Sequence, residues 1–310
     1  MGKLLWSQRH TLGPSERSAP AIAYDRARKQ MVLFGGVSGE SPQRAPDDTW
    51  EWNGQNWTQV ADFGPGGRYW HTMSYDENRN TVVLFGGCML DGIAKNDTWE
   101  WDGQYWTQVA DMGPSPRFLH AMASDMTNKR IVLFGGETSS AVTLQDTWLW
   151  DGNQWVQHDG SGPSPRRGHG MGYDEARRKV VLFGGNSDDE TNSEPSDTWE
   201  WDGTQWRRAA EFGPPPRMQI SLCWGGGEAG EMVLFGGNNF SKGIFGDTWG
   251  WNGRRWVERR NFGPAPRFGH VMGYDSDRHR VMLFGGCNFY SPYFSDTWEL
   301  FDHEPIPPPD

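Results

Sequence analysis

A pair of short motifs recurs six times along this chain of 310 residues and sets the period of its fold. The motif FGG is followed about a dozen residues later by DTW, and the pair returns after about fifty residues. FGG begins at Phe34, Phe85, Phe134, Phe183, Phe235 and Phe284, and DTW begins at Asp48, Asp97, Asp146, Asp197, Asp247 and Asp296. Because these repeats take up nearly the whole chain, they indicate one domain of repeated units rather than two ordinary domains.

Each repeat predicts four β-strands. In the second repeat the residues alternate in size or polarity over 71–76, 98–102 and 105–110, and an apolar run covers 81–85. The last two strands are joined by Asp102-Gly103, and four other repeats have Asp-Gly or Asn-Gly here, which predicts a two-residue type I′ turn. The sequence therefore predicts an all-β fold, a six-bladed β-propeller of four-stranded antiparallel blades.

The two ends of the chain complement each other. Trp6-Ser-Gln near the N-terminus aligns on Trp57-Thr-Gln of an outermost strand, and the last repeat ends after its third strand. We expect the N-terminal strand to close the last blade, since an open ring would leave an unpaired strand edge. The predicted domain covers residues 1–302, with a proline-rich tail at 303–310, and its blades comprise residues 14–62, 63–111, 112–160, 161–211, 212–261, and 262–302 together with 4–12.

Tryptophan is the most conspicuous residue type, and its distribution indicates a structural role. Seventeen of the 19 tryptophans fall at equivalent positions of the repeats, and only Trp70 and Trp224 lie elsewhere. We interpret the seventeen as core rather than as a sugar-binding platform, because large aromatics supply much of the buried area between short strands. The innermost strands keep one face small, as at Ala21 and Ala23, and we expect the larger residues of the other face to pack against the neighbouring blade.

Composition limits the partners and the compartment. The net charge of −11 argues against nucleic acid, because neutralising phosphates requires an excess of clustered Lys and Arg. Three cysteines with no paired short spacing predict neither a disulfide framework nor a zinc site, and they favour a reduced, cytoplasmic compartment. No apolar run is long enough to span a membrane. We expect a monomer with no membrane partner.

The repeated motifs resemble those of one known family. FGG, DTWxWDGxxW and GPxPRxxH occur together from residue 6 to residue 302, as in the Kelch-repeat β-propellers. The resemblance implies the propeller fold but no single activity, because this family includes adaptor proteins, sugar oxidases and a sialic acid mutarotase. The copper site of the galactose oxidase type maps onto no residues here, and we expect no cofactor.

The predicted strand order brings two sets of connections to one end of the ring, which we call the loop-rich end. They join the second strand to the third and the fourth strand to the next blade, and we expect binding there. The loop of the fourth repeat is acidic, whereas those of the fifth and sixth carry Phe240, Phe289, Tyr290 and Tyr293. These aromatics predict either an interface for a basic partner with apolar tips or loop cores that fold back over the blades.

Arginine recurs at the entry to each innermost strand, where six guanidinium groups would encircle one mouth of the central channel. These residues are Arg17, Arg68, Arg117, Arg166, Arg217 and Arg267. They predict either a binding site for a carboxylate or phosphate or six structural pairs with the six repeated aspartates. Binding residues more often break a repeat, and the breaks proposed as binding residues beside the mouth are Tyr69, Trp70, Phe118, Arg167 and Phe268.

Histidine stands three residues after four of these arginines, at His71, His120, His169 and His270. One histidine per blade spreads these side chains over several sheets, whereas the ligands of a metal converge on one ion about 2 Å away. We therefore predict no metal site and interpret the histidines as buried structural groups. No HExxH, GxSxG or P-loop motif is present, and no catalytic residue is assigned.

Two functions remain open from the sequence. The first is a binding module whose loop-rich end and channel mouth recognise a protein, a peptide or a small anionic ligand. The alternative is a sugar-acting enzyme, a mutarotase or isomerase more readily than an oxidase, with its site in the central pocket. That chemistry requires a titratable pair near the channel mouth, for which His71, His120 and the Asp and Glu residues of the long loops are candidates.

Overall fold

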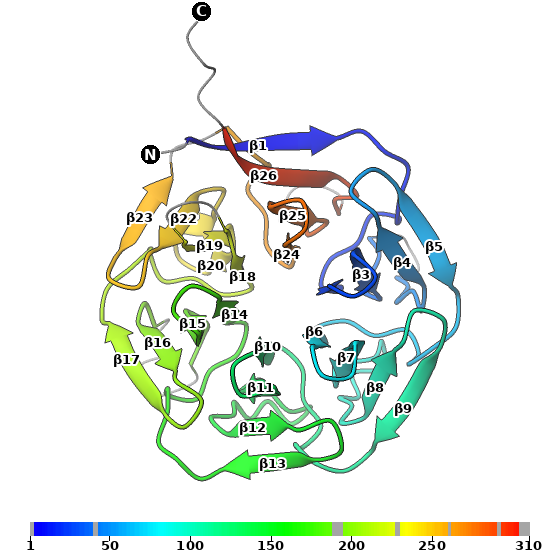
Figure 1. Ribbon diagram of the computed structural model, residues 1–310, viewed down its shortest axis with the longest axis horizontal. Coiled ribbons are helices and arrows are strands. Elements are labelled where there is room, and N and C mark those ends of the chain that lie inside the picture. The colour runs from blue at the N-terminus through cyan, green and yellow to red at the C-terminus, as the bar shows by residue number, and fades with distance from the viewer. Residues whose placement is uncertain are drawn as a thin grey trace, which may run out of the picture.

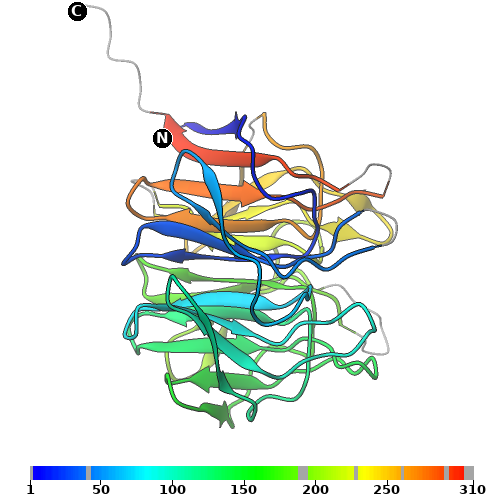
Figure 2. The same ribbon diagram turned by 90° about the vertical axis from the view of Figure 1, so that its right-hand side faces the viewer.

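The computed structural model describes residues 3–39, 43–187, 195–226, 230–259, 262–289 and 293–303. These residues form six four-stranded antiparallel sheets around a central axis (Figure 1). In the side view of Figure 2 the ring has two ends, and the loop-rich end faces right. The predicted all-β, six-bladed propeller is confirmed. The described residues contain no helix that could cross a membrane.

The strands of each blade run in order from the axis outward. Blade 1 consists of β2 (Ala21–Asp25), β3 (Gln30–Phe34), β4 (Thr49–Trp52) and β5 (Trp57–Ala61). Blade 2 consists of β6 (Thr72–Asp76), β7 (Thr81–Phe85), β8 (Thr98–Trp101) and β9 (Trp106–Ala110). Blade 3 consists of β10 (Ala121–Asp125), β11 (Arg130–Phe134), β12 (Thr147–Trp150) and β13 (Trp155–His158).

The second half of the ring repeats this order with two variations. Blade 4 consists of β14 (Gly170–Asp174), β15 (Lys179–Phe183), β16 (Thr198–Trp201) and β17 (Trp206–Ala210). Blade 5 consists of β18 (Ser221–Trp224), β19 (Met232–Phe235), β22 (Thr248–Trp251) and β23 (Trp256–Arg259), with a small hairpin of β20 (Asn238–Asn239) and β21 (Gly243–Ile244) in one connection. Blade 6 consists of β24 (Val271–Asp275), β25 (Arg280–Phe284), β26 (Thr297–His303) and the N-terminal β1 (Lys3–Arg9).

The ring closes through the N-terminal strand, as the sequence predicts. β1 pairs antiparallel with β26 over seven residues, from Lys3 opposite His303 to Arg9 opposite Thr297 (Figure 1). Trp6 in this strand donates a hydrogen bond from its indole to Thr248 Oγ1 of blade 5 at 3.1 Å. The outermost strand of blade 6 therefore also ties that blade to its neighbour.

The same tryptophan-to-threonine bond joins every pair of neighbouring blades. The tryptophan in each outermost strand donates from Nε1 to the threonine of the DTW motif in the preceding blade. The other five bonds, 2.8 to 3.0 Å long, are Trp57 to Thr297, Trp106 to Thr49, Trp155 to Thr98, Trp206 to Thr147 and Trp256 to Thr198. A buried indole N–H requires a partner, so the repeated Trp and Thr are explained together.

The innermost strands pack small residues against large ones. Ala21 and Ala23 of β2 share a core with Met73 and Tyr75 of β6 in the next blade. At the junction of blades 4 and 5, a Cβ on Gly172 would lie 2.9 Å from the backbone oxygen of Leu222, so a larger residue there would clash. The expected packing of the large face against the neighbouring blade is what the structure contains.

The turn between the third and fourth strands differs from the prediction. Trp52 pairs directly with Trp57, so the connection has four residues, and Gly54 has a φ of 91° whereas Asn53 has no positive φ. Asn53 Oδ1 accepts hydrogen bonds from the backbone N–H groups of Gln55 and Asn56, both at 2.9 Å. The two-residue type I′ prediction was wrong because the Asn side chain, rather than a second left-handed residue, closes the turn.

Removal of β1 should destabilise the whole propeller. Deletion of residues 1–12 leaves the outer edge of β26 unpaired and uncovers Phe235, whose ring centroid lies 5.5 Å from that of Trp6. The single substitution Trp6→Ala should lower the free energy of unfolding by about 3–5 kcal/mol. Tyr105→Ala, at an exposed aromatic on a hairpin, should change it by less than about 0.5 kcal/mol. Thermal unfolding followed by circular dichroism measures both, and a truncated chain that melts like the full chain would contradict this closure.

Candidate functional site

The two sets of connections at the loop-rich end are hydrogen-bonded to each other. In blade 1 the N–H of Ser18 donates to Val37 O at 2.9 Å, and the N–H of Val37 donates back to Ser18 O at 2.8 Å. Equivalent bridges join Tyr69 to Cys88, Phe118 to Glu137, Arg167 to Asn186, Met218 to Asn238 and Phe268 to Cys287. Four residues that break the repeat thus occupy one equivalent position around the channel mouth.

The six repeated arginines are buried and paired with the six repeated aspartates. Each arginine is at most 1% exposed, and its two terminal nitrogens donate to one carboxylate, as in Arg117 with Asp146 at 2.7 and 2.8 Å. The same carboxylate accepts the indole N–H of Trp148 at 2.6 Å. The six pairs are Arg17 with Asp48, Arg68 with Asp97, Arg117 with Asp146, Arg166 with Asp197, Arg217 with Asp247 and Arg267 with Asp296.

The pairing decides between the two interpretations of the arginines. In Arg117 all five N–H groups donate within the protein, the remaining acceptors being Ser115 O, Ser115 Oγ and Gly135 O. In blades 5 and 6 the rings of Phe245 and Phe294 stack on Arg217 and Arg267 at 3.8 and 4.0 Å. None of the six arginines lines the central cavity, so structural pairing accounts for them and the anion site does not.

Each aspartate is held in its charged form by its arginine. Burial opposes ionisation of Asp146, but the hydrogen bonds and the positive charge of Arg117 outweigh it and lower the pKa of this carboxyl. The other five aspartates have the same shift from the same causes. The pairs are therefore ionised at neutral pH.

The paired glycines of FGG join neighbouring blades at this end. The N–H of Gly36 in blade 1 donates to Arg68 O of blade 2 at 2.9 Å, and the equivalent bonds continue around the ring to Gly286 and Arg17. Gly35 and Gly36 have φ values of 65° and 101°, and a Cβ on Gly35 would lie 2.6 Å from Arg68 O. Both the backbone conformation and the close approach therefore require glycine.

A closed belt of six backbone hydrogen bonds surrounds the channel mouth. Its members stand two residues after each arginine: Ala19, Trp70, Leu119, Gly168, Gln219 and Gly269. Each N–H donates to the carbonyl of the preceding blade's member at 2.6 to 3.2 Å, and every member has a φ between 54° and 64°. A left-handed φ is strained for a side chain as bulky as Trp70. The belt thus holds Trp70 in a conformation that it would not adopt alone.

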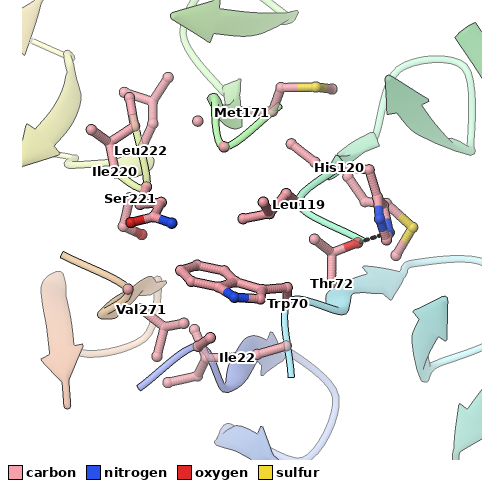
Figure 3. A pocket seen from close by; sticks show the side chains of 18 of the residues that line it. Ile22, Trp70, Thr72, Leu119, His120, Met171, Ile220, Ser221, Leu222 and Val271 are labelled. Atoms are coloured by element: carbon pink, nitrogen blue, oxygen red, sulfur yellow. Dashed lines mark hydrogen bonds between the residues drawn. The ribbon is translucent and has the colours of Figure 1, made fainter. Parts of the chain in front are cut away.

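A cavity of about 150 Å³ lies in the channel inside this belt (Figure 3). The indole of Trp70 extends across it, near Leu119 on one side and Ile22 and Val271 on the other (Figure 3). Thr72, Gln219 and Ser221 supply polar groups to the lining, which among the described residues contains no Asp or Glu. The cavity therefore exposes polar and apolar atoms in similar measure, and its described lining offers no carboxylate or guanidinium for a charged ligand to pair with.

The four histidines beside the cavity are buried between blades. The ring of His71 meets Phe34 of the preceding FGG motif edge to face at 5.6 Å, and His120, His169 and His270 meet Phe85, Phe134 and Phe235 in the same way. Burial, with the charge of Arg68 adding to it, lowers the pKa of His71 to about 3. The described residues contain no cluster of His, Cys, Asp or Glu side chains able to hold a metal ion.

An apolar collar separates this cavity from a second one of about 150 Å³ at the opposite end of the channel. The residues shared by the two linings are Met73, Met122, Met171, Leu222 and Met272. At the far end Arg26 of blade 1 forms ion pairs with Glu77 of blade 2, at 3.0 Å, and with Glu175 of blade 4. This end of the channel is therefore bridged by a side chain of blade 1 that reaches blades 2 and 4.

The aromatic residues of the loops divide between the two predicted roles. Phe245 and Phe294 are loop cores, since they stack on arginines. Phe240 and Phe289 are 74% and 56% exposed, and Phe289 contacts the half-buried Phe268 with ring centroids 5.2 Å apart. Tyr293 is half-buried and accepts a hydrogen bond from Gln43. Tyr290 lies outside the described residues.

The remaining breaks in the repeat also lie at the mouth. Tyr69 is half-buried, and burial together with the Cys88 thiol raises its pKa to about 12. Phe118 is half-buried, and Arg167 forms an ion pair with Glu137 at 2.5 Å. The structure therefore places Tyr69, Phe118, Arg167 and Phe268 around the channel mouth beside Trp70. Their role in binding stays a prediction.

One set of exposed residues escaped the sequence-based prediction. Five connections between blades carry a large apolar side chain directly before Gly-Pro: Leu12, Phe63, Met112, Phe212 and Phe262. All five are exposed. Repetition shows only that the positions are equivalent, and the structure is needed to distinguish a repeated buried residue from a repeated exposed one.

The repeated blades of this chain match those of a known protein family. Six four-stranded blades joined by FGG, DTW and arginine contacts define a six-bladed β-propeller. A family model, the KLHDC2/KLHL20/DRC7 Kelch-repeats domain, matches residues 47–200 and 100–252, together 206 of the 310 residues. The chain belongs to the Kelch-repeat family.

Two individual proteins are similar to the chain. Mei4-dependent protein 6 of Schizosaccharomyces pombe is 31% identical over 102 residues, which cover 29% of this chain and only 15% of that protein. The solved structure of YjhT superposes with a TM-score of 0.71 at 14% identity, covering 92% of this chain and 95% of the other. At this identity the likeness to YjhT shows the fold alone.

Protonation of the buried histidines should weaken the fold in mild acid. The pKa of His71 is about 3 in the folded protein, whereas an unfolded histidine titrates near about 6.5. Between these values the unfolded state binds more protons, so stability is present above about pH 6.5 and is lost as the pH falls below it. Ile220 occupies the equivalent position in blade 5, which makes His71→Ile a suitable substitution.

The parent protein should therefore lose about 2 kcal/mol more unfolding free energy between pH 7 and pH 5 than His71→Ile does. Urea denaturation of both proteins at the two pH values measures this difference. An equal loss in the two proteins would mean that His71 is not held neutral.

Proposed function

We propose that this chain is a protein-binding module that captures its partner with the apolar side chains of its loop-rich end. One distribution carries the proposal: ten of the thirteen exposed large apolar residues among the described ones lie in the connections of this end. They are Leu12, Phe63, Leu90, Ile93, Met112, Val142, Phe212, Phe240, Phe262 and Phe289. Apolar groups concentrated on one end favour association, because a partner that covers them removes them from water.

The aromatics of blades 5 and 6 are the strongest candidates for anchors. Phe240 and Phe289 are exposed in the loops of two neighbouring blades, and Phe289 rests against Phe268 at the channel mouth. Large aromatic side chains contribute most of the binding energy when a partner buries them. One partner segment that crosses blades 5 and 6 would contact all three.

The central cavity is better suited to bind a neutral group of the partner than a small anion. The six arginines already pair with aspartates. Among the described residues of the lining, the histidines are the titratable side chains beside the cavity, and burial keeps them neutral. Such a cavity suits an uncharged side chain inserted beside Trp70. We expect the protein to be a cytoplasmic monomer before it meets its partner.

The sugar-acting alternative lacks support in this cavity. Proton transfer to a sugar requires a group that titrates near the working pH. The lining residues described here offer histidines with a strongly lowered pKa and no carboxylate to pair with them. No second function is therefore proposed.

Two exposed aromatics should be required for capture of the partner. The double variant Phe240→Ser, Phe289→Ser should lose the partner proteins that the parent chain retains on an affinity column, with an unchanged melting temperature. Tyr105→Ser is the matched control, because Tyr105 is 59% exposed but lies at the opposite end. Quantitative mass spectrometry of the eluates measures the loss. Equal retention by the double variant and the control would contradict the proposal.

A further inference from the structure

A large apolar side chain is exposed in five of the six connections that lead into a blade. Leu12, Phe63, Met112, Phe212 and Phe262 are 96, 53, 80, 82 and 99% exposed, and we call them the apolar rim. Each stands directly before a Gly-Pro pair. These residues belong to the loop-rich end, and a role for them in binding rests on the proposed function of that end.

The glycine that follows each rim residue is fixed by packing. A Cβ on Gly13 would lie 2.6 Å from Trp57 Cδ1, and one on Gly263 would lie 2.6 Å from Trp6 Cδ1. The glycine is therefore pressed against the indole of an outermost strand, and no larger residue fits at its position. The residue before the glycine remains in water.

The fold itself does not require a large apolar residue at this position. Blade 4 has Ser161 there, and its Gly162 still lies against Trp206, with a Cβ distance of 2.9 Å to Cδ1. A serine thus serves the scaffold as well as phenylalanine does. Phe212 and Phe262 are 82% and 99% exposed, and contact of an apolar side chain with water is unfavourable. Because these residues gain little packing within the chain, their exposure indicates a surface for association with a partner.

The rim residues share one plane of the ring. They occupy equivalent positions in connections that run from the outermost strand of one blade to the innermost strand of the next (Figure 1). Equivalent positions in a ring of repeats lie at one level along the axis, here the loop-rich end that faces right in Figure 2. A partner lying over this end can therefore reach several rim residues at once.

Exposed carboxylates stand among the rim residues. Asp62 precedes Phe63, Asp111 precedes Met112 and Glu211 precedes Phe212. All three acidic residues are exposed. Asp62 and Asp111 form no ion pair with any described residue, whereas Glu211 forms an exposed ion pair with Arg208 at 2.6 Å. In blades 2 and 3 the surface thus places an unpaired negative charge beside an apolar side chain, and in blade 5 the carboxylate beside Phe212 is one that a stronger basic partner would have to share with Arg208.

This charge decides between the possible occupants. The carboxylates would repel an anionic lipid surface, and they would face one another if two copies of the chain met end to end. The net charge of −11 adds to both effects. A partner that carries positive charge beside apolar side chains complements the surface on both counts.

We propose that the apolar rim of blades 2, 3 and 5 is an interface for a protein segment in which basic and apolar side chains alternate. Phe63, Met112 and Phe212 supply the apolar contacts, and Asp62, Asp111 and Glu211 pair with the basic groups. The charge sets the partner's identity and rate of approach, and the apolar contacts supply most of the affinity.

Synthetic peptides of about twelve residues, long enough to extend over roughly 40 Å, serve as probes. One alternates lysine with leucine, a second alternates glutamate with leucine, and a third alternates lysine with serine. Binding to the full chain is followed by fluorescence anisotropy at low and physiological salt. We expect the lysine–leucine peptide to bind, more weakly at the higher salt, and the other two to bind at least tenfold less tightly.

Matched variants of the chain locate the site. Phe63→Ser, Met112→Ser and Phe212→Ser together copy the serine of blade 4, keep the fold, and should weaken the lysine–leucine peptide at least tenfold. Asp62→Asn, Asp111→Asn and Glu211→Gln together should remove most of the salt dependence, and Ser161→Phe should strengthen binding. Val156→Ser, at an exposed residue on the outermost strand of blade 3, is the control and should change nothing.

Several outcomes would overturn the inference. These are equal binding of all three peptides, an unchanged affinity of the rim variant, a concentration-dependent dimer that the rim variant abolishes, or retention of the parent chain on neutral phosphatidylcholine vesicles. The last two would assign the rim to a second copy or to a lipid surface. Loss of natural partners with Phe240→Ser, Phe289→Ser but not with the rim variant would overturn the inference while leaving the proposed function intact.

Discussion

A guanidinium buried at the entry to every blade is the interaction on which the rest of this propeller depends. Arg117 donates to Asp146 and to two backbone carbonyls, and Asp146 in turn accepts the indole N–H of Trp148. The backbone carbonyl of the same arginine accepts the N–H of Gly87 in the preceding blade. Because an unpaired buried charge costs several kcal/mol, the arginine, the DTW motif and the FGG motif are required together.

This use of charge in the scaffold leaves binding to the residues that the scaffold does not occupy. The arginines, the repeated tryptophans and four histidines make structural contacts within and between blades. What remains at the loop-rich end is a neutral cavity under Trp70, the aromatics of blades 5 and 6, and the apolar rim with its carboxylates. These features favour recognition of a protein surface over chemistry on a small charged substrate.

Much of the fold was predictable because each motif has a local cause. Glycine pairs mark left-handed backbone, alternating residues mark strands, and an N-terminal segment that aligns on an outermost strand predicts how the ring closes. The turn at Asn53 was mispredicted because side-chain capping competes with a type I′ turn for the same residue pair. Of the candidate site, the sequence predicted that Trp70 and Phe268 break the repeat, but not that Trp70 spans a cavity.

The sequence by itself determined the number of blades, their four strands and the closure of the ring, because these follow from periodicity and local backbone preference. Only the tertiary structure decided which repeated residues are buried, since a period says that positions are equivalent and not which way their side chains face. The FGG and DTW repeats place Arg117 and Met112 in the same connection. One is fully buried against Asp146 and the other is 80% exposed, because packing between blades, rather than sequence spacing, determines which of them meets water.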